Sequence, residues 1–92
     1  MEIKFEESES KGTFYIEENG IRVGEMIFSK AYPDRIIIEH TEVSDALRGK
    51  NAGKQLVAAG VEYARKNKLK IIPLCPFARS VFDRVKEYQD VL

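Results

Sequence analysis

The stretch 47–56, "LRGKNAGKQL", has the residue types of an anion-binding loop. Two glycines and an asparagine allow positive φ or a close approach to the backbone, and a helix-like apolar pattern begins directly afterwards. A helix start exposes about four unpaired N–H groups and about half a positive charge. Three basic side chains surround this point, those of Arg48, Lys50 and Lys54. The local chemistry suits a diphosphate, and the alternative is a basic helix cap that binds nothing.

Two better-known phosphate motifs do not fit this stretch. The Walker pattern GxxxxGK[ST] fails because Gly49 and Gly53 are too close together and Lys54 is followed by Gln55. The Rossmann fingerprint opens a series of parallel strand-helix-strand units, whereas the strands predicted before residue 47 are antiparallel. If the loop binds phosphate, it belongs to another class.

Few side chains offer acid-base chemistry. Glu39 and His40 are neighbours in a predicted strand, so they point to opposite faces unless a bulge lies between them. Histidine, with an ordinary pKa of about 6.5 against about 4.3 for glutamate, is the better base near neutral pH. The alternative is a histidine that only hydrogen-bonds within the sheet. No metal site is expected.

Cys75, the only cysteine, lies between Pro73 and Pro76. Both prolines lack an N–H group and favour extended conformations before them, so the strand ending here can pair only incompletely with its neighbour. The sequence therefore predicts a gap between two adjacent strands with Cys75 at its mouth. The alternative is an inert buried cysteine.

The elements that position these residues follow from periodicity. Apolar and charged residues alternate in 1–7, and two apolar runs within 13–30 are joined by Glu18-Asn19-Gly20, a strong hairpin signal. A fourth strand is predicted over 34–43, in which Ile36 to Ile38 suggest burial on both faces. An amphipathic helix is predicted over about 51–67, a fifth strand over 69–75 and a second helix over 76–88. The expected order is four strands, helix, strand, helix.

The whole chain of 92 residues is predicted to be one domain, 1–92. Residues 1–46 carry five basic and eleven acidic side chains, a net −6, and residues 47–92 carry ten basic and four acidic, a net +6. A total charge of zero argues against a nucleic-acid partner, and no apolar run suits a membrane span or a secretion signal. A single cysteine fits a cytoplasmic location.

The stretch "RGKNAG" is similar to the Arg/Gln-x-x-Gly-x-Gly/Ala pyrophosphate loop of the GNAT superfamily, the acetyl-coenzyme A-dependent N-acyltransferases. In that family the loop follows the fourth strand and opens the helix that binds the coenzyme diphosphate. The resemblance extends over nearly the whole chain, through residues 39–57 to "IIPLCPFA" at 71–78. It implies an α+β fold with a mostly antiparallel twisted sheet of about five strands, two helices, and strands four and five splayed. It is closest to a short branch that lacks the early helices and final strands of larger members.

The resemblance assigns the diphosphate to a run of six residues, Arg48, Gly49, Lys50, Asn51, Ala52 and Gly53, to which Lys54 adds a charge. Asn51 stands where the family usually has a glycine, and Val43 matches the strand position whose backbone meets the acyl-pantetheine arm. Phe82 falls where larger members often carry a tyrosine that protonates the departing thiolate. Tyr88 is a candidate replacement, although a tyrosine near a helix end more often serves packing.

These residues imply transfer of an acetyl group from acetyl-coenzyme A to an unidentified amine. His40 or Glu39 is the expected base, and Cys75 is expected to accept the acyl group or steer a proton. Direct transfer is favoured over an acyl-enzyme, because no cationic partner for a Cys75 thiolate is evident in the sequence. The alternative is a non-catalytic module that binds the coenzyme for sensing or for a partner protein.

Overall fold

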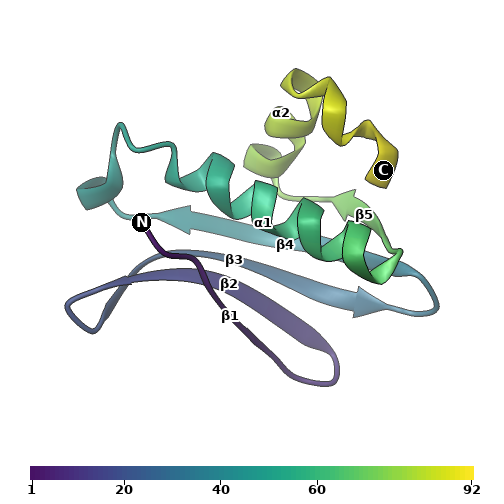
Figure 1. Ribbon diagram of the computed structural model, residues 1–92, viewed down its shortest axis with the longest axis horizontal. Coiled ribbons are helices and arrows are strands. Elements are labelled where there is room, and N and C mark those ends of the chain that lie inside the picture. Colours follow the sequence, from purple (N-terminus) through teal and green to yellow (C-terminus); the bar gives the residue numbers. More distant parts are fainter.

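A computed structural model describes all residues 1–92 and contains one five-stranded sheet (Figure 1). Its strands are β1 (Lys4–Glu7), β2 (Lys11–Glu18), β3 (Ile21–Ala31), β4 (Arg35–Val43) and β5 (Lys70–Pro73), and they lie side by side in chain order. The first four are antiparallel. β5 runs parallel to β4 because helix α1 (Ala52–Asn67) forms the crossover between them. The predicted α+β fold and order of elements are confirmed.

The β2–β3 hairpin turns at the predicted residues. Asn19 and Gly20 have φ of 53° and 79°, and both residue types tolerate the positive φ that this two-residue turn requires. β2 and β3 then alternate, so that Phe14 and Ile16 face the same side of the sheet as Met26 and Phe28. This side forms the hydrophobic core.

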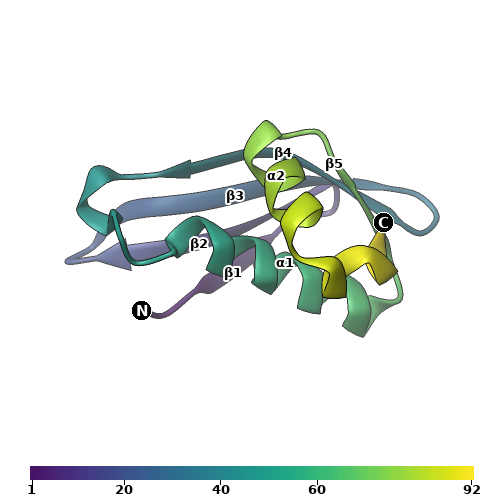
Figure 2. The ribbon, with the colours of Figure 1, turned by 90° about the horizontal axis from the view of Figure 1, so that it is seen from above.

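Helices cover only one face of the sheet (Figure 2). α1 and α2 (Pro76–Arg84) both pack on the core side, and neither is long and apolar enough to cross a membrane. Ile36 and Ile38 of β4 are fully buried beneath them. Ile37 is only half-buried on the opposite face, which we call the open face. The expectation that β4 is buried on both faces was therefore wrong, because no second layer covers the sheet.

The helix ends agree with the sequence for α1 and differ for α2. α1 ends at Asn67, as predicted, and Lys68 turns the chain with a φ of 58°. α2 ends at Arg84 rather than near residue 88, and a 3₁₀ turn, Lys86–Val91, follows. Arg65 of α1 holds that turn by donating to the Glu87 carbonyl at 2.7 Å. A contact between distant parts of the chain therefore replaces the last turn of the predicted helix.

Candidate functional site

β4 and β5 separate at the point where Cys75 begins α2. Their pairing runs from Arg35 opposite Lys70 to Ile38 opposite Pro73. β4 then continues to Val43, paired with β3 but no longer with β5. The Ile38 carbonyl accepts the N–H groups of both Leu74 and Cys75, each at 3.1 Å. The ladder ends there because β5 turns away into α2. The predicted gap between the two strands is thus present.

The backbone of Val43 faces this gap. Ser44 donates its N–H to the Val23 carbonyl of β3 at 2.7 Å. Backbone polar groups of successive strand residues point to opposite sides, so those of Val43 point away from β3 and toward the space that β5 has left. An extended ligand lying in the gap could pair with them.

The Cys75 sulfur lies among hydrogen-bond donors. Cys75 is only 7% exposed, and burial by itself disfavours a thiolate. The amide of Ala78, the hydroxyl of Thr41, and then the amides of Phe77 and Thr41 outweigh burial and lower the pKa of Cys75 below its ordinary value. The sequence offered no cationic partner for this thiol; the groups that favour its thiolate are backbone amides and one hydroxyl, which sequence reasoning did not identify.

The loop 48–54 leads into an uncapped helix. It follows a short 3₁₀ turn, Asp45–Leu47, and passes through Gly49 with φ of 82°. Asn51 is the N-cap of α1 in the left-handed conformation, with φ of 56°, and its side chain makes no capping hydrogen bond. The first turn of α1 also contains no acidic residue. Its amides and its positive dipole end are therefore without a side-chain partner.

The three basic side chains of the loop differ in whether they form ion pairs. Arg48 forms an ion pair with Asp45 at 3.1 Å, with both side chains largely in solvent. Lys50 and Lys54 are exposed and take part in no ion pair. Two free ammonium groups thus flank the start of α1, while the guanidinium is already partly neutralised.

Gly53 has a different role from the one expected. Sequence reasoning took its missing side chain as room for a phosphate. A Cβ on Gly53 would instead lie 2.5 Å from Cζ of Phe77, an α2 residue two positions after Cys75. Gly53 therefore lets the starts of α1 and α2 pack together, and only its N–H is left for an anion.

A β-bulge decides where Glu39 and His40 point. In the β3–β4 register Phe28 is opposite Ile38 and Ile27 is opposite His40, so Glu39 is an extra residue. Glu39 accepts a hydrogen bond from Ser29 at 2.7 Å on the open face, and His40 faces the same side as its partner Ile27. The bulge is the exception allowed for in the sequence analysis, and it puts both side chains on one face. His40 is exposed, and its side chain has no hydrogen bond like the one that Ser29 donates to Glu39.

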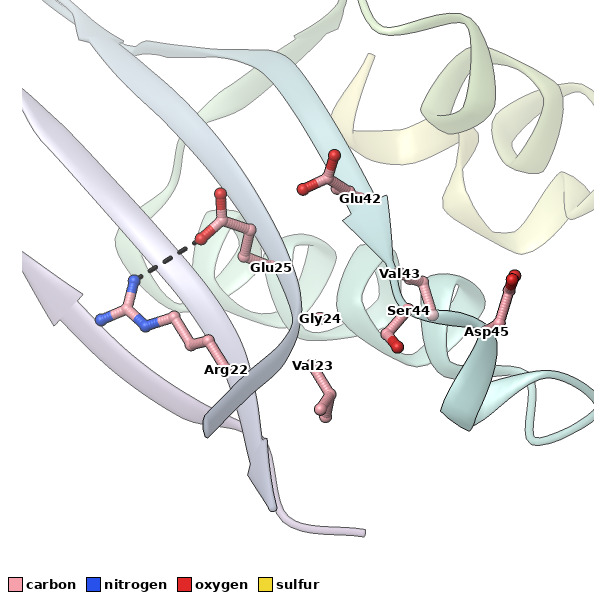
Figure 3. Close-up of a pocket in the computed structure, with 8 residues that line it drawn as sticks. All are labelled: Arg22, Val23, Gly24, Glu25, Glu42, Val43, Ser44 and Asp45. Atoms are coloured by element: carbon pink, nitrogen blue, oxygen red, sulfur yellow. Dashed lines mark ion pairs between the residues drawn. The ribbon is translucent and has the colours of Figure 1, made fainter. Parts of the chain in front are cut away.

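A cavity of about 410 Å³ opens at the ends of β3 and β4 (Figure 3). Glu25 and Glu42, directly opposite each other in the register, line it together with Asp45. Arg22 approaches Glu25 at 3.6 Å and is the only cation in the lining. Like charges directly opposite in a sheet destabilise it, so a positively charged ligand here would be favoured. The only indication of this acidic cavity in the sequence was the net negative charge of residues 1–46.

Phe82 and Tyr88 offer no acid to the gap. Phe82 is fully buried, and the Tyr88 ring packs edge-on against it with centroids 6.1 Å apart. The Arg65 guanidinium lies over the other part of that ring, 5.9 Å from the centroid. Tyr88 therefore serves packing at the end of the chain, and the alternative role considered for it has no structural support.

Several solved acetyltransferase structures share this fold. A candidate GCN5-like N-acetyltransferase from Staphylococcus aureus matches with 42% identity and a TM-score of 0.75, over 98% of this chain and 85% of that one. The ribosomal-protein-alanine N-acetyltransferase of Brucella melitensis biovar Abortus 2308 matches with 20% identity and a TM-score of 0.68, over 83% and 61%. A candidate streptothricin acetyltransferase from Bacillus anthracis, in complex with acetyl coenzyme A, gives 18% and 0.60, over 72% and 39%. The last two support the fold alone.

Among curated proteins no significant match was found. The family model of the GCN5-related N-acetyl-transferases matches residues 13–91. That range includes β3, β4 and β5, most of β2, the loop 48–54, the gap and Cys75. The chain therefore belongs to the GCN5-related N-acetyltransferase family.

Proposed function

We propose that this protein binds acetyl-coenzyme A and transfers its acetyl group to an amine. The observation that carries the proposal is the contact between Gly53 and Phe77, which sets the starts of α1 and α2 side by side. One start is uncapped and follows the basic loop, and the other holds Cys75 beside the gap. A ligand with a diphosphate at one end and a thioester at the other would meet both.

The loop 48–54 would hold the diphosphate. Backbone amides at the start of α1 supply donors, and Lys50 and Lys54 supply charge. The pantetheine arm would then extend along β4, where the backbone of Val43 faces the gap, and bring the thioester to Cys75. The N-terminus of α1 and the edge of β4 that β5 leaves unpaired would together hold the coenzyme.

The amine would approach from the open face. His40 points to that face, and the carboxylates of Glu25, Glu42 and Asp45 would attract a cationic acceptor. The neutral amine attacks the carbonyl carbon, the bond to the coenzyme sulfur breaks, and the amine proton passes to His40 or solvent. The coenzyme leaves as a thiolate and takes a proton from solvent. Activity should therefore rise with pH and level off, and His40→Ala should remove that rise if His40 is the base.

A route through Cys75 is the second candidate, and the lowered pKa of its thiol favours it. The thiolate attacks the acetyl carbonyl carbon, the carbon–sulfur bond to the coenzyme breaks, and an acetyl-Cys75 forms. The amine then attacks that acetyl group and restores the Cys75 thiolate. The sequence alone favoured direct transfer, and the donors around the sulfur reduce that preference.

Two measurements test the proposal. Calorimetry with acetyl-coenzyme A should show binding, and an acceptor screen of diamines and lysine peptides should release free thiol. Incubation without acceptor, followed by mass spectrometry, separates the routes: an acetyl adduct that a later amine removes supports Cys75, and its absence supports direct transfer. Binding without turnover for any amine would favour the non-catalytic module instead, and no binding at all would refute both.

A further inference from the structure

Thr41 carries a buried hydroxyl with no hydrogen-bond partner. Its Oγ1 is the only buried side-chain nitrogen or oxygen in the structure that is left unpaired. Such a group costs stability, because it has lost its water without gaining another partner. Such atoms are few in native proteins and each calls for an explanation, so the surroundings of Thr41 are informative.

The bulge at Glu39 places Thr41 toward the core. The register sets Thr41 opposite Met26, which is fully buried, and His40 opposite Ile27 on the open face. Without the extra residue the alternation would be reversed, so that His40 would point into the core and Thr41 to the open face. The bulge therefore sends a titratable side chain to the open face and a hydroxyl to the core side of the gap.

The hydroxyl and the backbone N–H of Thr41 both lie close enough to the Cys75 sulfur to lower the pKa of its thiol. The amides of Phe77 and Ala78, at the start of α2, approach the same sulfur from the other side. The donors that lower the pKa of Cys75 are backbone amides and one hydroxyl, all of them uncharged. The Thr41 hydroxyl forms no hydrogen bond to Cys75 or to any other group, and a thiol is in any case a weak acceptor. A thiolate is a strong acceptor and would satisfy the hydroxyl.

We propose that Thr41 is a positioning residue whose hydroxyl donates to the Cys75 thiolate and holds the sulfur at the gap. The proposal rests on the proposed function, in which the acetyl thioester lies beside Cys75. When the thiolate forms its bond to the acetyl carbon and the coenzyme thiolate leaves to be protonated by solvent, Thr41 keeps its own proton. The acylated sulfur no longer accepts well, so Thr41 loses its partner. That loss favours return of the acetyl group to an amine.

Because Cys75 is the only cysteine, its ionisation can be followed cleanly by ultraviolet absorbance and by the rate of alkylation with iodoacetamide. Thr41→Val should raise the pKa of Cys75 and slow its alkylation at neutral pH, by about tenfold for each pKa unit. Thr41→Ser keeps the hydroxyl and should behave like the unmodified protein. Thr13→Val, on the open face of β2, makes the same chemical change far from the sulfur and should alter neither quantity.

Stability separates this role from a structural one. Thr41→Val removes an unpaired hydroxyl at nearly constant shape, so the thermal midpoint should not fall. If this variant does not fold, Thr41→Ala replaces it in both assays. A folded Thr41→Val or Thr41→Ala protein with unchanged Cys75 ionisation and alkylation would overturn the proposal, as would a Thr41→Ser protein that loses both. These assays contain no coenzyme, so a failure to bind acetyl-coenzyme A would refute the proposed function without affecting them.

Discussion

Gly53 on α1 and Phe77 on α2 are in such close contact that a Cβ on the glycine would lie 2.5 Å from Cζ of the ring. The loop that we assign to the diphosphate and the turn that holds Cys75 are therefore mechanically connected. A side chain added at Gly53 must displace the Phe77 ring or the helix that carries it. Substitutions at Gly53 consequently cannot be interpreted as effects on phosphate contacts alone.

Gly53→Ala should destabilise the protein by about 1–3 kcal/mol, the usual cost of overpacking. Combining it with Phe77→Ala should recover part of this loss relative to the two single variants, because the ring that the new methyl group meets is gone. Urea unfolding of the four proteins gives the coupling energy. If the two effects simply add, the close contact is absent in solution and the connection between the helix starts does not exist.

Substitutions of Asn51 test whether the loop requires the left-handed backbone conformation at this position or the asparagine side chain itself. Asn51→Gly should keep the affinity for acetyl-coenzyme A, because glycine adopts the observed φ of 56° without strain. Asn51→Val should weaken binding, since a β-branched residue pays at least about 1–2 kcal/mol in this region, equivalent to roughly tenfold or more. Calorimetry measures both. Equal binding by the valine variant would remove this loop from the coenzyme site.

The ion pair between Arg48 and Asp45 predicts opposite effects of two charge changes. Asp45→Asn frees the guanidinium and should tighten coenzyme binding, whereas Lys50→Ala removes a free ammonium group and should weaken it. Each change is expected to be about two- to fivefold, from about 0.3–1 kcal/mol per exposed charge near a helix start, and to shrink with added salt. Titrations at low and moderate ionic strength test this. Affinities that do not respond to salt would contradict it.

Acid should destabilise the fold partly through Asp90. The bidentate contact from Arg65, at 2.8 and 3.1 Å, holds the pKa of Asp90 below its ordinary value. Because the folded pKa is the lower one, this stabilisation is complete above the unfolded value of about 3.9 and is lost as pH falls through the folded value. Melting curves of Asp90→Asn should therefore show a weaker pH dependence below about pH 4. Asp83→Asn is the matched control, and an unchanged slope in Asp90→Asn would refute the assignment.

The sequence predicted those features that depend on neighbouring residues. Asn19-Gly20 specified the hairpin because both residues accept positive φ, and the prolines around Cys75 predicted the end of the β4–β5 ladder because they lack N–H groups. The stretch "RGKNAG" identified the loop before α1 for the same reason: its residue types report local backbone geometry.

Features that depend on contacts between distant residues were missed. The bulge at Glu39 is defined only by the register against β3, so the directions of His40 and Thr41 could not be obtained from β4 alone. Likewise, the partner of Gly53 is a side chain on another helix, and the end of α2 depends on Arg65. The only sequence signal for Thr41 was a polar residue near the end of a strand, which is too common to be informative.

The sheet's strands lie in the same order as in the chain, and this has a kinetic consequence. The pairings among β1 to β4 are all between consecutive strands and close short loops, whereas β5 must wait for α1 to bridge back to β4. The gap between β4 and β5 therefore lies at the boundary between a meander of local pairings and the part of the fold that we expect to assemble late. In hydrogen-exchange experiments we expect the Leu74 and Cys75 amides to exchange before those of central β2 and β3. The region around the gap would then open locally while the pairing of β2 with β3 remains intact.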